Sequence, residues 1–219
     1  MDEPDQPWRH HDHLGPGNTL RRPGARAAPG AGGHRADRTR FHRRNPRRRR
    51  RRAYPGQGPD PEGASVFTAA SETLRLSGIE ADINTGGRYQ ALKPRLLAMD
   101  RAAQADEIRR LLASPDVVIG SVAALTETGS LVLASASGSQ LPANAGGAAR
   151  AIWIVGAQKV VPDLGTALRR VEDHALPLES ARAQVAYGQP SAVNRLLVLN
   201  AEPHPGRGTV LLLREAIGF

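Results

Sequence analysis

The strongest constraint on this chain is the uneven distribution of apolar residues and charge along it. Residues 1–60 contain no Val or Ile, eight of the 17 Pro, and 15 Arg against six Asp and Glu. This segment lacks the apolar surface that offsets the chain entropy lost on folding, so we expect a disordered basic tail over 1–60. Residues 61–219 hold 15 acidic and 15 basic residues, and we expect them to form one α/β domain.

The tail carries the whole net charge of +9. Its run of six arginines, 47–52, is one candidate for a basic arm that neutralises phosphates of a nucleic acid. Aromatic residues are sparse around it and no nucleic-acid-binding motif is present, so nucleic acid is not the partner we expect. Two other interpretations stay open: a solvated tail without a role, and translation of GC-rich DNA in a wrong frame or from a wrong start.

The composition also excludes several kinds of site. The chain has no Cys, which rules out disulfides, thiolate zinc sites, the usual iron–sulfur ligation and a cysteine nucleophile. His174 and His204 lack the spacing of zinc ligands. No apolar run approaches the ~18 residues typical of a membrane span, and the N-terminus has no apolar signal segment. We therefore expect a cytoplasmic protein that binds no metal or cofactor of its own.

Short apolar segments alternate with helical segments across 61–219, which favours a three-layer α/β domain with helices on both faces of a sheet. Strands are predicted at 62–67, 117–125, 131–134, 151–155, 160–161, 196–199 and 210–213. Helices are predicted at 71–79, 100–113, 163–174 and 179–186, and Lys93–Pro94 is expected to break any single helix through 89–99. Neither a dinucleotide fingerprint nor a P-loop nor a nucleophile elbow is present.

A turn between two apolar strands, 126–129, is the first candidate site. Its carboxylate, Glu127, is placed to act as a general base or nucleophile if burial raises its pKa. Thr126, Thr128 and Gly129 are then candidates for substrate or anion binding. The alternative is a solvated surface turn in which Gly129 supplies a positive φ.

Three further features are candidates for anion binding. The small residues Gly138, Ser139 and Gln140 let main-chain amides approach an anion closely, although the same composition is typical of a flexible loop. Lys159, one of two lysines in the chain, follows a buried strand and offers a point charge to a phosphate or carboxylate. An exposed surface lysine is the alternative. Arg207, between two glycines, is either an anion ligand or a solvated turn residue.

The amino-acid sequence of 62–219 resembles the LUD-domain family of lactate-utilisation proteins. The matching stretches are DVVIGSVAALTETGSLVLASASGSQLPANAGG, AIWIVGAQKVVPDLGTALRRVEDHALPLESARAQVAYGQPS and NRLLVLNAEPHPGRGTVLLLREAIGF, with TETG, GSQ, VGAQK and VPDL in that order. The resemblance implies a fold like that of ribose-phosphate isomerases, glucosamine-phosphate deaminases and CoA transferases. Family members normally begin with a helical region, whose place the Arg/Pro-rich tract takes here.

For some members the resemblance also implies a part in oxidising L-lactate to pyruvate, beside an iron–sulfur subunit and a Cys-rich partner. On this reading the chain is an accessory component, its face of TETG, GSQ and Lys159 binds a small anion, and any iron–sulfur cluster sits on the partner. Two alternatives remain. One is an enzyme of the CoA-transferase or sugar-phosphate isomerase type that uses Glu127 as its carboxylate. The other is a partner-binding module without catalysis.

Overall fold

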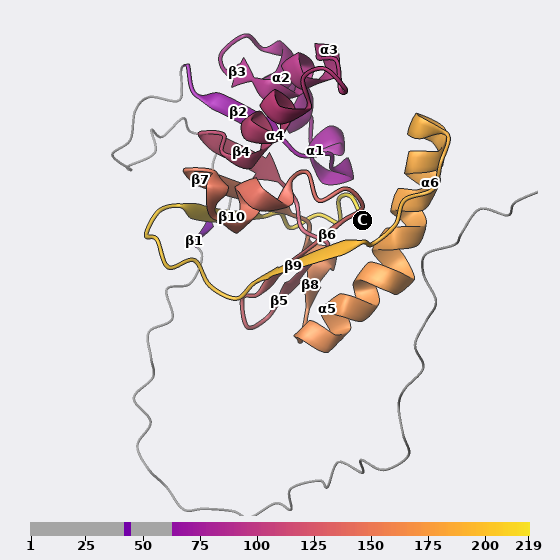
Figure 1. The fold of residues 1–219 in the computed structure, drawn as a ribbon. Coiled ribbons are helices and arrows are strands. Elements are labelled where there is room, and N and C mark those ends of the chain that lie inside the picture. The colour runs from indigo at the N-terminus through magenta and orange to yellow at the C-terminus, as the bar shows by residue number, and fades with distance from the viewer. Residues whose placement is uncertain (1–41, 45–62) are drawn as a thin grey trace, which may run out of the picture. The chain divides into compact units, whose positions relative to one another are not determined.

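A computed structural model of the chain describes residues 42–44 and 63–219, all within one compact unit that spans residues 37–219. It is a mixed α/β fold with two sheets (Figure 1). The first sheet is parallel throughout and has the strand order β1-β10-β7-β4-β2-β3. Its strands are β1 His42–Arg44, β2 Ser65–Thr68, β3 Gln90–Ala91, β4 Val117–Gly120, β7 Arg150–Val155 and β10 Gly208–Leu212.

The predicted tail 1–60 lies outside the described residues except for β1, which pairs with β10 at one edge of the sheet. An edge strand needs only main-chain hydrogen bonds to its neighbour, so it forms without the Val and Ile of a packed core. The prediction of a tail without a core of its own therefore does not conflict with this short strand.

A second sheet has the order β8-β5-β6-β9 and is mostly antiparallel. Its strands are β5 Ala124–Thr126, β6 Leu131–Ser135, β8 Val160–Val161 and β9 Arg195–Leu199. The predicted single strand 117–125 is wrong in this respect, because it contains β4 of the first sheet and β5 of the second. The chain leaves β4 at Gly120, and Ser121–Ala123 carry it across to β5. Strands β5 and β6 pair antiparallel and form a hairpin around the turn 126–129.

Two of the helices, α1 and α5, begin at a residue whose side chain caps them. Ser71 Oγ accepts a hydrogen bond from the Leu74 amide, and Asp163 Oδ1 accepts one from the Thr166 amide at 2.7 Å. No single helix runs through 89–99, as predicted, but the break is not at Lys93–Pro94: residues 90–91 form β3, and Pro94 lies in the first turn of α3, where a missing N–H costs nothing. The helices are α1 Glu72–Leu76, α2 Ile79–Thr85, α3 Leu92–Ala98, α4 Ala105–Ala113, α5 Leu164–Arg170 and α6 Leu176–Tyr187, with short helical turns η1 Ala143–Gly147, η2 Ala157–Lys159 and η3 Val171–Ala175.

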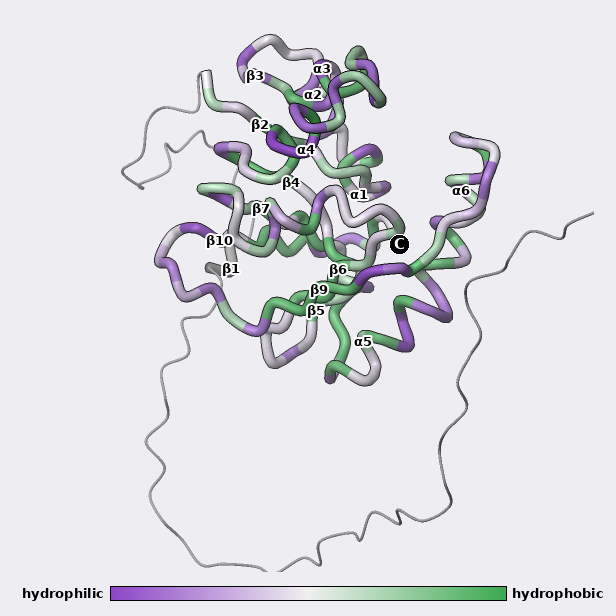
Figure 2. The backbone as a smooth tube through the Cα atoms, viewed as in Figure 1, coloured by the Kyte–Doolittle hydropathy of each residue, from purple (hydrophilic) through white to green (hydrophobic). Residues whose placement is uncertain are grey.

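The core forms largely from apolar strands, several of which are green in Figure 2. Trp153 on β7 is fully buried at its centre, and its indole N–H donates to Asn144 Oδ1 at 2.8 Å. Helices α1–α4 lie around β2, β3 and β4, whereas α5 packs on β5 and β8 (Figure 1). Among the described residues, no helix is both long and apolar enough to cross a membrane.

The strand order singles out the edge of the parallel sheet that is formed by the carboxyl ends of its strands. Strand β2 has β3 on one side and β4 on the other, so the strand order reverses there. In open α/β sheets, ligands bind beyond the carboxyl ends of the strands at such a reversal. The residues that leave β2, β4 and β7 at this edge are Ala69, Ser121 and Gly156.

Candidate active site

Lys159 lies in the turn that leaves this edge at the end of β7, and only 2% of its surface is exposed. Its Nζ donates hydrogen bonds to Ser121 Oγ and to the Val122 carbonyl, both at 3.0 Å. Ser121 is half-buried and Val122 is buried, so the amine has one partner near the surface and one in the interior. The expectation that Lys159 follows a buried strand is confirmed, and the alternative of an exposed lysine is wrong.

The electrostatics around Lys159 favour its neutral form. Burial, reinforced by the positive charge of Arg170, lowers the pKa of Lys159 from 10.5 to about 7. None of the ion pairs among the described residues includes Lys159. A buried lysine without a carboxylate partner, at the edge of a sheet where ligands bind, is a candidate functional group.

Arg170, from the last turn of α5, is held beside Lys159. Its NH1 donates to the Ala123 carbonyl at 2.6 Å and its Nε to the Gln158 carbonyl at 3.4 Å. These two carbonyls adjoin Val122 and Lys159 in the chain, so the guanidinium bridges the same two segments as the amine does. Arg170 is half-buried, and burial lowers its pKa. The side chain has five N–H groups in a planar fork suited to carboxylates, and these contacts occupy two of them.

The segment 213–219 closes over the same edge. The Gln158 side chain donates to the Ile217 carbonyl at 2.9 Å and to the Gly218 carbonyl at 2.8 Å, and its Oε1 accepts from the Ile217 amide at 3.2 Å. Gly218 has a φ of +71°, and a Cβ there would come within 2.8 Å of the Thr73 amide nitrogen. Gly218 is therefore the residue that permits this close approach between the segment and α1.

The predicted turn 126–129 lies at the far end of β5 from Val122. Glu127 is exposed, and its amide donates to the Val161 carbonyl at 2.8 Å. Thr126 is buried, with its hydroxyl 2.8 Å from that of the exposed Thr128, and Gly129 has a φ of +100°. Glu127 lies five residue steps from Val122, about 16 Å along extended chain. The main chain of this turn therefore borders the segment that follows Lys159, but the Lys159 amine lies at the other end of β5, where it bonds to the Val122 carbonyl.

The predicted loop at Gly138, Ser139 and Gln140 follows β6, whose antiparallel register places Ser135 at the Ser121 end of β5. The Gly138 amide donates to Ser135 Oγ at 2.8 Å, and Gln140 Nε2 donates to the Ala134 carbonyl at 3.3 Å. Ser139 is exposed, and Gly138 has a φ of +80°. The loop thus lies toward the Lys159 end of the hairpin, with its polar groups bonded largely within itself.

Arg207 does not have the role of an anion ligand or of a solvated turn residue. It is 9% exposed, and its Nε and NH2 donate to the carbonyls of Ala148, Ala143 and Asn144 at 3.0, 2.9 and 3.2 Å. Its NH1 pairs with Glu202 at 2.5 Å. The guanidinium thus connects η1 to the end of the β9–β10 connection, and its hydrogen bonds are used within the fold.

Sequence reasoning missed Ser121, Val122 and Arg170. The signal for Ser121 and Val122 was the pair Gly120 and Ser121, because two small residues inside an apolar run are typical of the end of a strand. Arg170 follows Arg169 on an amphipathic helix and looks like a solvated residue, so no signal in the sequence distinguishes it.

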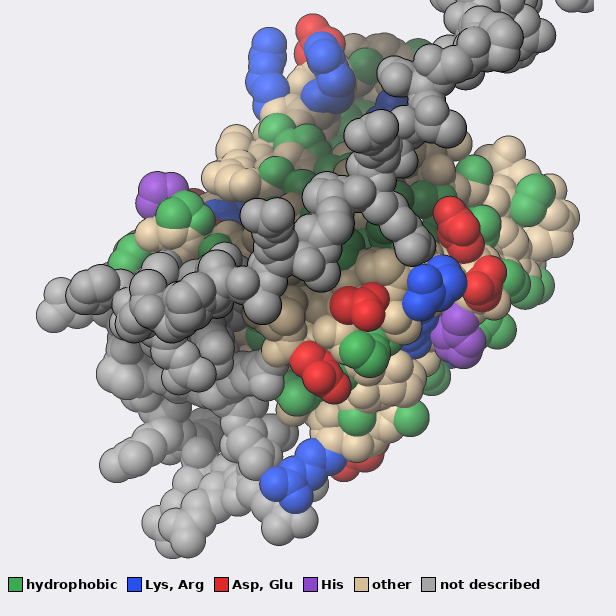
Figure 3. Space-filling view, turned by 90° about the horizontal axis from the view of Figure 1, so that it is seen from below, with side chains coloured by type: hydrophobic (Ala, Val, Ile, Leu, Met, Phe, Trp, Pro, Cys, Tyr) green, Lys and Arg blue, Asp and Glu red, His purple; other side chains and the backbone are tan. Residues whose placement is uncertain are grey.

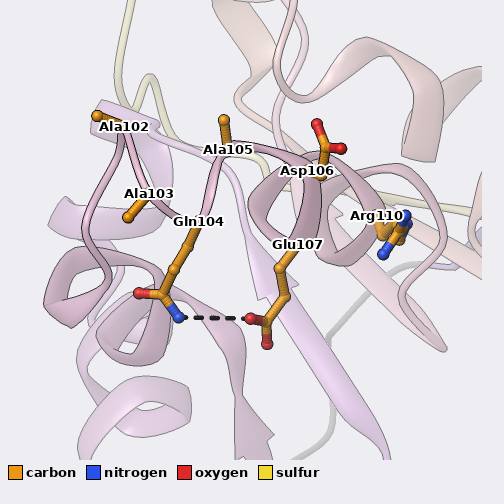
Figure 4. Close-up of a pocket in the computed structure, with 7 residues that line it drawn as sticks. All are labelled: Ala102, Ala103, Gln104, Ala105, Asp106, Glu107 and Arg110. Atoms are coloured by element: carbon orange, nitrogen blue, oxygen red, sulfur yellow. Dashed lines mark hydrogen bonds between the residues drawn. The ribbon is translucent and has the colours of Figure 1, made fainter.

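Other surface features of the described residues offer weaker sites. A hollow at the start of α4 (Figure 4) is lined by Ala102, Ala103, Gln104, Ala105, Asp106, Glu107 and Arg110. It shares no residue with the surroundings of Lys159. Among residues 42–44 and 63–219, no group of three or more His, Asp or Glu is placed to hold a metal ion. On the face in Figure 3, acidic and basic side chains are interspersed wherever described residues are visible.

Comparison with known proteins identifies the family of this chain. A search of curated proteins gave no match. Among solved structures, the chain is similar to the crystal structure of a DUF162 family protein from Deinococcus radiodurans, with 15% identity, a TM-score of 0.33, and coverage of 68% of this chain and 87% of that one. The profile of the LUD domain matches residues 61–196. The chain therefore belongs to the LUD-domain family, as the resemblance predicts.

Proposed function

We propose that this protein is an accessory component of L-lactate oxidation to pyruvate that binds a small carboxylate beside Lys159 and acts with an iron–sulfur oxidoreductase subunit in the cytoplasm. Membership of the LUD-domain family over 61–196 is the observation that carries this proposal. The arrangement of Lys159 and Arg170 supports it, because Arg170 lies beside the buried amine and has N–H groups left for an anionic ligand.

The ligand that fits this site is a small carboxylate. Arg170 keeps N–H groups beyond the two that bond to the Ala123 and Gln158 carbonyls, and a planar fork pairs with both oxygens of a carboxylate. Ser121 offers a hydroxyl on the half-buried side of Lys159. A 2-hydroxy or 2-oxo acid presents both a carboxylate and a neighbouring oxygen, so it can use the fork and the Lys159–Ser121 pair together.

Electron transfer in this proposal belongs to the partner. The sequence holds no Cys, so it cannot supply the thiolates that ligate an ordinary iron–sulfur cluster. The chain contributes a ligand site and a docking function, and the partner contributes the redox centre.

The proposal is tested in the organism that encodes the chain. An affinity-tagged chain is purified from lactate-grown cells, and its co-purifying proteins are assayed for iron and acid-labile sulfide. In parallel, the gene is deleted and growth is compared on L-lactate and on pyruvate. We expect an iron–sulfur protein in the purified complex and a growth defect on L-lactate alone. Normal growth of the deletion strain on L-lactate would overturn the proposal.

Matched variants in the complementation assay separate this proposal from an enzyme that uses Glu127. Lys159→Met removes the amine while keeping an unbranched apolar side chain, and Glu127→Gln removes only the charge of the exposed turn carboxylate. We expect Glu127→Gln to restore growth on L-lactate and Lys159→Met to fail. The reverse result would favour the CoA-transferase-like alternative.

A further inference from the structure

We propose that Lys159 condenses with the carbonyl group of a small 2-oxo acid to form an imine, while Arg170 holds the carboxylate of the same molecule. This inference deepens the proposed function and rests on it for the substrate class, because a 2-oxo acid is what oxidation of a 2-hydroxy acid yields. The amine, its two hydrogen-bond acceptors and the guanidinium all lie at the carboxyl edge of the parallel sheet.

The hydrogen bonds of Lys159 match a neutral amine. A neutral amine has two N–H groups and one lone pair, whereas an ammonium has three N–H groups and no lone pair. The described residues give Nζ two acceptors, Ser121 Oγ and the Val122 carbonyl. Both N–H groups of the neutral amine are then satisfied, and its lone pair remains to attack an electrophile.

The surroundings of Lys159 are those that activate a lysine nucleophile. Lysines that form imines are made reactive by removal from water or by a neighbouring cation. Lys159 has both, since it is 2% exposed and lies in the field of Arg170. The resulting fall of its pKa to about 7 leaves roughly half of the molecules with a neutral amine near neutral pH.

Arg170 and Ser121 define how a 2-oxo acid would be oriented. Arg170 bonds to the Ala123 and Gln158 carbonyls, next to Val122 and Lys159, so a carboxylate on its remaining N–H groups lies close to the amine. The Ser121 hydroxyl occupies the half-buried side of Nζ. The carbonyl carbon approaches Nζ along its lone pair, while the hydrogen bonds to Ser121 and to the Val122 carbonyl hold the amine in place.

The step is a condensation without any redox change. The Nζ lone pair forms a bond to the carbonyl carbon, the two amine protons pass to the carbonyl oxygen, and the C–O bond breaks as this oxygen leaves as water; a proton from solvent then binds the imine nitrogen. A C=N bond replaces the C=O bond, and the imine nitrogen is protonated. No oxidant, reductant or further reactant is required.

Borohydride trapping tests this inference on the full chain. The protein is incubated with pyruvate near neutral pH and treated with sodium borohydride, which converts an imine to a stable carboxyethyl amine. Peptide mass spectrometry then locates the adduct. The chain contains only two lysines, and Lys93, which is ion-paired with Glu80, serves as an internal control. We expect the adduct on Lys159 to exceed that on Lys93 by about tenfold or more, given the larger neutral fraction of an amine with a low pKa.

Two variants distinguish an imine from incidental modification. Lys159→Met is expected to remove the adduct peptide. Arg170→Met, which keeps the bulk of the side chain, is expected to reduce trapping of pyruvate by about tenfold more than trapping of acetone, which has no carboxylate for the guanidinium. A merely structural Arg170 would affect both carbonyl compounds alike. Circular dichroism establishes that each variant is folded, and Arg170→Met keeps the test decisive if Lys159→Met does not fold.

Each result has one meaning. Absence of an adduct on Lys159 in the folded wild-type chain, or equal labelling of Lys93, overturns the imine. Loss of the imine together with a retained lactate phenotype and iron–sulfur partner leaves the proposed function standing. Conversely, trapping on Lys159 in a chain whose deletion does not affect growth on lactate would retain the amine chemistry and overturn the lactate role.

Discussion

Lys159 and Ser121 are 38 residues apart in the chain, yet the lysine Nζ lies 3.0 Å from the serine Oγ. The contact exists because the chain leaves β4 at Gly120 and returns through η2 after β7, and these are neighbouring parallel strands. The two residues therefore meet beyond the carboxyl ends of β4 and β7, next to the reversal of strand order between β2 and β4, and open α/β sheets bind their ligands at such a reversal.

The stability of the folded chain is expected to depend on the protonation of Lys159. Burial lowers its pKa from 10.5 to about 7, so between these values the unfolded chain binds more protons than the folded chain does. The free energy of unfolding therefore rises with pH across this window, by up to about 1.4 kcal/mol per pH unit from this group. Below the window both states are protonated, and the dependence vanishes.

Urea denaturation of the wild type and of Lys159→Met at several pH values measures this effect. The difference between their free energies of unfolding isolates Lys159 from the other titrating groups. The groups that face its Nζ are Arg170, which stays charged across the window, and the non-titrating Ser121 and Val122. A difference that does not change from about pH 7 to about pH 10 would show that the pKa is not lowered on folding.

Arg207 is expected to be essential for stability. Arg207→Met would leave Glu202 as a buried charge without its partner, and three main-chain carbonyls would lose their donor. Breaking a buried pair in this way typically costs about 3–5 kcal/mol. The matched control is Arg109→Met, because Arg109 pairs with Asp106 on the surface, where such pairs contribute about 1 kcal/mol or less. If chemical denaturation gave equal losses in the free energy of unfolding for the two variants, the contacts of Arg207 with η1 and Glu202 would not have the stabilising role described.

Gly218→Ala is expected to release the segment 213–219 from the edge of the sheet. A Cβ at this residue would clash with Thr73, whereas at Gly188, with a similar φ of +74°, no atom lies within 4 Å. Gly188→Ala therefore carries only the cost of the left-handed backbone, about 1–2 kcal/mol. Hydrogen exchange at Ala157, whose amide donates to the Glu215 carbonyl at 3.1 Å, reports the release. Unchanged protection of this amide in Gly218→Ala would argue against the close packing.

Glu127→Gln is expected to leave both stability and trapping unchanged. The carboxylate is exposed on a turn at the far end of β5, so its removal should alter the free energy of unfolding by about 0.5 kcal/mol or less. Loss of the borohydride adduct in this variant would mean that Glu127 reaches the amine, contrary to its place in the fold.

Local sequence signals predict most of the elements, but not how they combine. Ser71 and Asp163 mark the starts of α1 and α5 because a side-chain oxygen caps each helix. The continuous apolar run 117–125 hides the division between the two sheets, since a buried strand and a crossing segment have the same composition.

The candidate site shows the same limit. Lys159 is recognisable from its position after a buried strand, as is the turn that contains Glu127. Lys159 precedes β8 and Glu127 follows β5. Whether the side chain of either residue is buried depends on how these two strands pair, and no local sequence pattern encodes this long-range contact. Arg170 gains its role only when α5 packs against β5, so the sequence alone gives no reason to prefer it to Arg169.

The most direct test of the account is an NMR titration of the two lysine side chains. Selective ¹⁵N labelling of lysine gives signals from Lys93 and Lys159 alone, and the variant Lys159→Met assigns them. We predict that the Lys159 signal titrates with a midpoint of about 7 in the folded chain. A midpoint near the ordinary lysine value of about 10.4 would contradict the buried neutral amine on which the proposed chemistry depends.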